Sequence, residues 1–236
     1  AALAACMMFT LSAPALAEST DALMQLSIGS YRNVSLHSEN SVTIPYIEVS
    51  GTVVTENNYT NILGDGTLSY DPDTNTLKST GGINRGLTIN APNVNVVLEG
   101  KADERYCTVN GNLTIKDAHD VTVSHPNFRA ISGNATIYCS GKLKISAPGE
   151  NSANGVGRKL TVQHADEVEI DANFQYVAGD GIEIQDCVGT VTLRNARATG
   201  KIAPSFSYAR TDGASYSYYL SENGNRPDPR PHHEPP

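Results

Sequence analysis

Regularly spaced acidic side chains are the first residues in this chain that could do chemistry. Asp71, Asp73 and Asn75 stand at the D-x-D-x-N spacing that opens a calcium-binding loop. The complete loop also has glycine at its sixth position and glutamate at its twelfth, where this chain has Thr76 and Gly82. Because half of the ligands are missing, we interpret the motif as a turn between two strands and assign no metal site.

A second acidic motif, AGDGIEIQD, occupies residues 178–186. Its carboxyl groups, on Asp180, Glu183 and Asp186, are of the type that a glycosidase places on both sides of the bond it cleaves. The motif resembles the GDD stretch of β-helical polysaccharide hydrolases, but the chain lacks their other motifs: NTD, a histidine between glycines, and Arg-Ile-Lys. We therefore predict an Asp-Gly corner followed by a strand with Glu183 outward, and assign no catalytic residue.

Two histidines occupy matching positions in similar corners. His119 lies in DAHD and His164 lies in QHAD. If these corners stack, the two imidazoles would meet and could hold a metal ion; the simpler interpretation is that both are solvated corner residues. The chain contains no phosphate-binding loop, dinucleotide-binding fingerprint or nucleophile elbow, so we expect no cofactor.

Tyrosine is the aromatic residue best suited to stack on a sugar here, because the chain has no tryptophan. Several tyrosines gather in the segment SFSYARTDGASYSYYL, residues 205–220: Tyr208, Tyr216, Tyr218 and Tyr219. In a strand, Tyr216 and Tyr218 would share one face and could form an aromatic platform. The segment can equally be read as a capping strand that closes the open end of a repeat structure. The ligand-binding residues therefore stay unassigned.

A short repeat positions these motifs. Five runs begin with glycine and place one polar residue between two apolar ones: GLTINA, GNLTIKDA, GKLKISA, GRKLTVQHA and GTVTLRNA, starting at Gly86, Gly111, Gly141, Gly157 and Gly189. In an extended strand the apolar pair points to one side and the middle residue to the other. A strand this short cannot bury its apolar side alone, so the pattern predicts stacked copies, as in a β-solenoid. The apolar runs start 26, 30, 17 and 31 residues apart, and we attribute the unequal intervals to loops inserted at corners.

We therefore predict an all-β fold: a single-stranded parallel β-helix of about six turns over residues 84–203. An antiparallel β-sandwich is the alternative, because it also uses short strands at turn-rich spacing. The corners KDAHD and QHADE lack the Asn-Gly or Asp-Gly of tight hairpins, which favours the solenoid. Upstream, residues 46–83 are predicted to form a β-hairpin block in which 67–70 and 76–79 pair across a turn at 71–75.

The ends of the chain differ from the repeat. Residues 1–17 combine an apolar stretch with a closing A-x-A site, which is typical of a secretory signal peptide cleaved between Ala17 and Glu18. The tetrapeptide LAAC, which ends at Cys6, is similar to a lipoprotein lipobox, but the apolar residues after it argue against lipidation. The other divisions are an N-terminal segment (18–45), a tyrosine- and serine-rich capping segment (204–220) and a proline-rich linker or tail (221–236). We expect a secreted or cell-surface protein.

The block GTVVTENNYTNILGDGTLSYDPDTNTLKSTGGI resembles a segment of secreted proteins from anaerobic gut bacteria, in which GTxVTxN, LGDGTxSYDP and TNTL recur in this order. The clear match covers residues 46–83, and a looser one continues to about Ala203. Members of that family usually continue as a right-handed β-helix and are labelled as carrying a carbohydrate-binding domain. The resemblance thus implies this fold and an extracellular glycan partner. This chain departs from the family at Asp73, where a small residue is usual, and at Lys78-Ser79-Thr80, where a short strand is expected.

The composition limits the function further. The 236 residues carry 17 Lys and Arg against 25 Asp and Glu, a net charge of −8, which argues against nucleic-acid binding. No other stretch reaches the ~18 apolar residues of a membrane span. Cys107, Cys139 and Cys187 are interpreted as small buried hydrophobic residues, with one disulfide left open. We predict a non-catalytic protein that binds glycans or adheres through the outside of the solenoid; the alternatives are a polysaccharide lyase or hydrolase and a structural stalk for another module.

Overall fold

The computed structural model describes residues 42–149, 154–197 and 199–208, and the backbone of three further strands. These strands are β1 (Met24–Leu26), β2 (Val34–Leu36) and β18 (Ser215–Leu220). The chain divides into two units, Ala1–Val42 and Thr43–Pro236, and in the first unit β1 pairs antiparallel with β2. The predicted signal peptide and the proline-rich tail lie outside the described residues.

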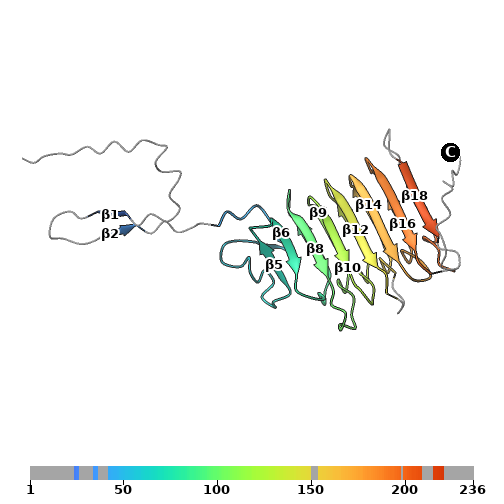
Figure 1. Ribbon diagram of the computed structural model, residues 1–236, viewed down its shortest axis with the longest axis horizontal. Coiled ribbons are helices and arrows are strands. Elements are labelled where there is room, and N and C mark those ends of the chain that lie inside the picture. The colour runs from blue at the N-terminus through green and yellow to red at the C-terminus, as the bar shows by residue number, and fades with distance from the viewer. Residues whose placement is uncertain are drawn as a thin grey trace, which may run out of the picture. The chain divides into compact units, whose positions relative to one another are not determined.

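The second unit contains two eight-stranded sheets whose inward side chains form one apolar core, and Figure 1 shows strands stacked one after another along the unit. Sheet 1 has the order β4-β3-β7-β9-β11-β13-β15-β17, and sheet 2 has the order β5-β6-β8-β10-β12-β14-β16-β18. The strands of sheet 1 are β3 (Glu48–Val49), β4 (Thr52–Val53), β7 (Leu87–Asn90), β9 (Leu113–Asp117), β11 (Ala135–Tyr138), β13 (Lys159–His164), β15 (Gly181–Ile184) and β17 (Phe206–Tyr208). Those of sheet 2, besides β18, are β5 (Leu68–Asp71), β6 (Thr76–Ser79), β8 (Asn95–Glu99), β10 (Val121–Ser124), β12 (Lys142–Ala147), β14 (Glu167–Ala172) and β16 (Thr190–Asn195).

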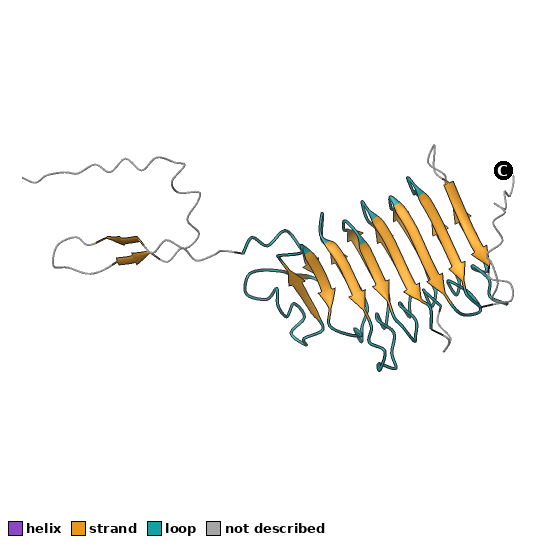
Figure 2. Ribbon diagram, viewed as in Figure 1, coloured by secondary structure: helices purple, strands orange, loops and turns teal. Residues whose placement is uncertain are grey.

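The chain alternates between the two sheets. From β6 onward, each strand pairs in parallel with the next strand of its own sheet. A third ladder of single parallel bridges links the segments between a strand of sheet 2 and the next strand of sheet 1. Its members are Ile83, Val109, Ile131, Val156 and Ala178. Strands and loops are the only elements of this stack among the described residues (Figure 2). The predicted parallel β-solenoid is therefore confirmed, with about five turns rather than six.

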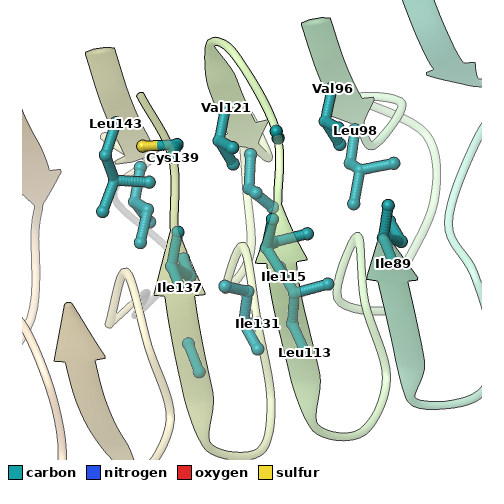
Figure 3. Packing of buried hydrophobic residues seen from close by; sticks show 14 of the residues in the cluster. Ile89, Val96, Leu98, Leu113, Ile115, Val121, Ile131, Ile137, Cys139 and Leu143 are labelled. Atoms are coloured by element: carbon teal, nitrogen blue, oxygen red, sulfur yellow. The ribbon is translucent and has the colours of Figure 1, made fainter. Parts of the chain in front are cut away.

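The interior of the solenoid holds the apolar side chains that the strand pattern points inward. Along sheet 1, Ile89, Ile115 and Ile137 lie in register on successive strands, and each is completely buried (Figure 3). Burying an aliphatic side chain of this size contributes about 1.5–3 kcal/mol relative to leaving it exposed. Because every turn repeats the arrangement, each turn supplies the apolar surface that its neighbours need.

The register corrects the predicted repeat. Leu87, Leu113 and Leu160 belong to sheet 1, whereas Leu143 and Val191 belong to sheet 2. The predicted repeat therefore combined strands from both sheets, which is why the intervals between its copies were unequal. Two rungs of sheet 1 were left out of the repeat: β11 was missed because it begins with alanine, and β15 was predicted as a strand but not as a copy of the repeat. From β7 and β8 onward, residues paired in register are 22 to 27 positions apart.

Antiparallel strands close the N-terminal end of the stack. The predicted hairpin is confirmed, since β5 pairs antiparallel with β6 across the turn that follows Asp71. In sheet 1, β3 pairs antiparallel with both β4 and β7. Apolar side chains from this block fill the end of the core: Ile47, Val49, Val54, Ile62, Leu68 and Tyr70 are all buried. An end cap of this kind prevents the first parallel rung from exposing a free apolar edge.

Glycine allows close approach between turns at the corners. A Cβ on Gly86 would lie 2.9 Å from the carbonyl oxygen of Asn112, and one on Gly189 would lie 2.7 Å from that of Asp166. Both contacts involve backbone of an adjacent turn, so the corner cannot move away cheaply. The glycine that opens the repeat is thus required by the spacing of turns.

The three cysteines within the described residues are free thiols. Cys139 and Cys187 are buried, and the predicted role as small hydrophobic residues holds for both. Cys107 is only half-buried. Within the same residues, no helix is long and apolar enough to cross a membrane.

Candidate binding face

A ladder of threonines runs along the outer face of sheet 1. Thr88, Thr114, Thr136 and Thr161 are paired in register on four successive strands. Each is the polar residue between two buried apolar ones, so its hydroxyl faces outward. Neighbouring strands are about 4.8 Å apart, so the ladder presents one hydroxyl at each such step along the solenoid axis. Each hydroxyl can donate one hydrogen bond and accept two.

Side-chain amides flank this threonine ladder. On one side, the Asn112 side-chain oxygen accepts a hydrogen bond from the Asn134 backbone N–H (2.9 Å), and that of Asn134 accepts one from the Lys159 backbone N–H (3.2 Å). On the other side lie Gln163 and Gln185, both exposed. The outer face of sheet 1 is therefore rich in neutral groups that both donate and accept hydrogen bonds.

An aromatic cluster stands at one edge of the same face. Tyr138 ends β11 two positions after Thr136, and its side chain is 38% exposed. Its ring stacks on that of His164, with centroids 5.1 Å apart and planes inclined by 27°. His164 Nδ1 lies 2.6 Å from the Asp186 carboxylate. The carboxylate fixes the proton on Nδ1 and orients the imidazole, which in turn holds the tyrosine ring in place.

The charged groups of this face are largely paired. The Lys159 ammonium lies 2.5 Å from the Glu183 carboxylate, and the Gln185 side-chain amide donates to the same carboxylate at 2.9 Å. The hydrogen bond from Lys159, followed by that from Gln185, lowers the pKa of Glu183 below its ordinary value. Glu183 is in register with Thr161, so this ion pair ends the threonine ladder.

Sheet 2 presents a different outer face, which is covered by ion pairs. Lys142 contacts Glu167 at 3.2 Å and Glu169 at 2.8 Å. Arg194 contacts Glu169 at 3.2 Å and Asp171 at 3.4 Å. The hydrogen bond from Lys142 is the main cause that lowers the pKa of Glu169. These charges neutralise one another between turns, as expected for a cross-strand network that supports the sheet.

A small cavity lies beside the third ladder. Its lining residues are Gly82, Ile83, Asn84, Glu104, Tyr106 and Cys107, and its volume is about 210 Å³. The Glu104 carboxylate already accepts hydrogen bonds from the backbone N–H groups of Gly82 (2.7 Å) and Lys101 (3.0 Å). Burial raises the pKa of the Cys107 thiol, so it is a poor nucleophile at neutral pH. The cavity is smaller than the ~300–1,000 Å³ of usual ligand pockets.

The residues of the calcium-like motif serve the hairpin. Asp71 accepts a hydrogen bond from the Asp73 backbone N–H and pairs with the Lys78 ammonium at 2.8 Å. Asn75 has a positive φ of 49°, and its side chain links the Tyr70 hydroxyl to the carbonyl of Asn93. The interpretation of this motif as a turn is confirmed.

The three carboxyls of AGDGIEIQD are separated along a single rung. Asp180 precedes β15 and lies 3.6 Å from Arg158, Glu183 is within β15, and Asp186 follows it. Of the three, Glu183 alone lies within the strand. Each one faces a different cationic or imidazole partner, and the predicted outward direction of Glu183 is confirmed.

The structure separates the two corner histidines. Ala118, Cys139, Ala165 and Cys187 follow one another at the same corner in successive turns. His164 precedes this column and His119 follows it, so the two imidazoles lie in different columns and do not stack. His119 instead lies 3.3 Å from the neighbouring carboxylate of Asp120.

Most of the tyrosine-rich segment lies outside the described residues. The side chains of β18 lie outside the described residues, but its backbone register sets Tyr216 beside Val191 and Tyr218 beside Leu193. The cluster formed by Tyr138, His164 and Asp186 was not predicted. The tyrosine is the last residue of the alanine-led rung ATIY that the repeat template missed, and a search for outward aromatic residues at 22- to 27-residue spacing would have found it.

The outer face of sheet 1 therefore offers a rigid aromatic ring, a row of hydroxyls and flanking amides. Such a surface can bind an extended polar molecule that has apolar patches. No family model, curated protein or solved structure matches this chain.

Proposed function

We propose that this protein binds extracellular glycans, without chemically changing them, through the outer face of sheet 1. The observation that carries the proposal is the oriented ring of Tyr138, held on His164 beside the threonine ladder. Sugars combine apolar C–H faces with a rim of hydroxyls. An aromatic ring offers a surface for the former, and threonine and amide groups offer partners for the latter.

The face is also preorganised for such a ligand. The threonines are held by parallel strands and the tyrosine by the His164–Asp186 pair, so little side-chain ordering remains to be done on binding. Export to the cell exterior, where such glycans occur, belongs to the same proposal and is supported by the signal-peptide pattern of residues 1–17.

A glycan array followed by calorimetry on the best ligand tests the proposal. Tyr138→Ala is expected to weaken binding by about tenfold or more, since it removes a stacking surface worth about 1.5 kcal/mol. Tyr46→Ala is the matched control, because Tyr46 is also an exposed tyrosine (54%) but lies in the N-terminal cap. Equal loss in both variants, or no binding to any glycan, would refute the proposal.

Two threonines allow a second matched comparison. Thr136 in sheet 1 and Thr122 in sheet 2 both sit between buried apolar residues on four-residue strands. Thr136→Val removes a hydroxyl from the proposed binding face, whereas Thr122→Val removes one from the opposite sheet. Only the first is expected to weaken binding, by about two- to tenfold for one lost hydrogen bond.

The lyase or hydrolase alternative would have to use the carboxyls on and around β15. Asp180, Glu183 and Asp186 are each engaged with another side chain, and they lie before, within and after the strand. Release of reducing or unsaturated sugars that is lost in Asp180→Asn would favour this alternative. The stalk alternative predicts no binding to any glycan, which the array also measures.

A further inference from the structure

The outer face of sheet 1 carries charges that bear on the class of glycan it accepts. Among the described residues of this face, the cations are Lys116 and Lys159, and the anions are Glu48, Asp117, Glu183 and Asp186. Lys159 is paired with Glu183, and Asp186 with His164. Lys116 remains as an exposed cation, with Asp117 as its chain neighbour.

An anionic glycan would find a poor partner here. Recognition of carboxylate or sulfate groups in proteins relies on unpaired Arg or Lys donors, and a chain of such groups needs several of them. The carboxylate of Glu183 stands at the end of the threonine ladder and pairs with Lys159, so this lysine offers no free charge to an acidic sugar that followed the ladder. The hydroxyls and amides along the ladder, in contrast, match neutral sugar units.

We infer that the face selects neutral polysaccharide chains laid along the solenoid axis, and that Glu183 excludes acidic ones by neutralising Lys159. This inference rests on the proposed function. The ladder from Thr88 to Thr161 spans three strand intervals, or about 14 Å, so an oligosaccharide of a few units covers it. Tyr138, two positions after Thr136 on the same strand, anchors one unit beside the ladder.

The first experiment compares neutral and acidic probes on the full chain. Mannan and β-glucan oligosaccharides serve as neutral probes and oligogalacturonate as the acidic one, each at low and high salt. We expect neutral probes to bind with a dissociation constant that changes by less than about twofold between low and high salt, because an uncharged sugar forms no ion pair that salt could screen. Tighter binding of oligogalacturonate than of every neutral probe would overturn the inference while leaving glycan binding intact. Failure of every probe and of the glycan array would instead refute the proposed function.

The second experiment tests the role of Glu183 directly. Glu183→Gln keeps the shape of the side chain but frees the Lys159 ammonium, and is expected to tighten oligogalacturonate binding by about two- to fivefold, the value of a half-exposed ion pair. Asp71→Asn is the matched control, since Asp71 also pairs with a lysine, Lys78, but in sheet 2, and asparagine keeps the oxygen that accepts the turn hydrogen bond. An unchanged oligogalacturonate affinity in Glu183→Gln, or an equal gain in both variants, would overturn the inference.

Discussion

Replacing Ile115 in the central part of sheet 1 tests the stacked core most directly. Ile115 is completely buried and lies in register between Ile89 and Ile137 (Figure 3). Ile115→Ala leaves a cavity that both neighbouring turns line, and such changes cost about 2–5 kcal/mol. Ile115→Asp loses the same packing and also buries a carboxyl group.

The loss of stability caused by Ile115→Asp depends on pH. Burial of this kind raises a carboxyl pKa by about three units, and each unit corresponds to about 1.4 kcal/mol. At neutral pH the added cost is therefore on the order of 4 kcal/mol. Since the folded pKa is raised, this cost is absent below about pH 4 and grows as the pH rises through the interval between the unfolded and folded pKa values. The total approaches the 5–15 kcal/mol by which a typical domain is stable.

Urea unfolding followed by circular dichroism at pH 4 and pH 7 measures both the cost of the lost packing and the cost of the buried carboxylate. We expect Ile115→Asp to unfold the solenoid at pH 7 and to approach Ile115→Ala at pH 4. Thr114→Ser, at the outward-facing position next to Ile115, is the control and should unfold at the same urea concentration as the parent protein. If Ile115→Asp unfolded at the same urea concentration as the parent at pH 7, the inward aliphatic ladder would be refuted.

Two further predictions concern a buried histidine and a corner glycine. His125 is completely buried, its Nδ1 accepts hydrogen bonds from the backbone N–H groups of Asn127 (3.1 Å) and Phe128 (2.9 Å), and burial lowers its pKa despite the opposing charge of Glu104. The unfolded chain therefore binds the proton more tightly than the folded chain, so the free energy of unfolding should fall as the pH drops below about 6.5, the ordinary pKa of histidine. Urea midpoints measured from pH 7.5 down to pH 5.5 test this, and a midpoint that rises as the pH is lowered would contradict it. Gly189→Ala should destabilise the protein by about 1–3 kcal/mol, because the alanine Cβ would meet the backbone of the adjacent turn. Thr190→Ala, at the following exposed position, is the control and should leave the stability unchanged; equal thermal midpoints for the two variants would argue against the close corner.

Local features of the fold could be predicted because their causes lie within a few residues. Alternation of polar and apolar residues identifies the strands, and Asp71 and Asn75 identify the hairpin turn through their own side-chain hydrogen bonds. The shortness of the runs required stacking, since no single strand could bury its apolar side. Parallel stacking and inward aliphatic residues thus followed from the sequence.

The assignment of rungs to faces was less accessible to sequence reasoning. Both sheets use the same apolar-polar-apolar run, so Leu143 and Leu160 look equivalent although they line different sheets. The rung at Ala135 was missed because alanine there carries little apolar signal. Its place is set by Leu113 below and Leu160 above, which no local pattern contains.

By itself, the sequence determined the short strands with inward aliphatic residues, the corner glycines and the hairpin near the start, and it favoured a solenoid over a sandwich, since each depends on neighbouring residues or on a repeated local pattern. Only the tertiary structure decided which outward residues meet. Tyr138 and His164 are 26 positions apart in the chain, and His164 and Asp186 are 22 apart; they come together because one full turn separates successive rungs. A contact of that kind depends on the length of every corner in the turn, and its register is fixed by packing of the whole stack.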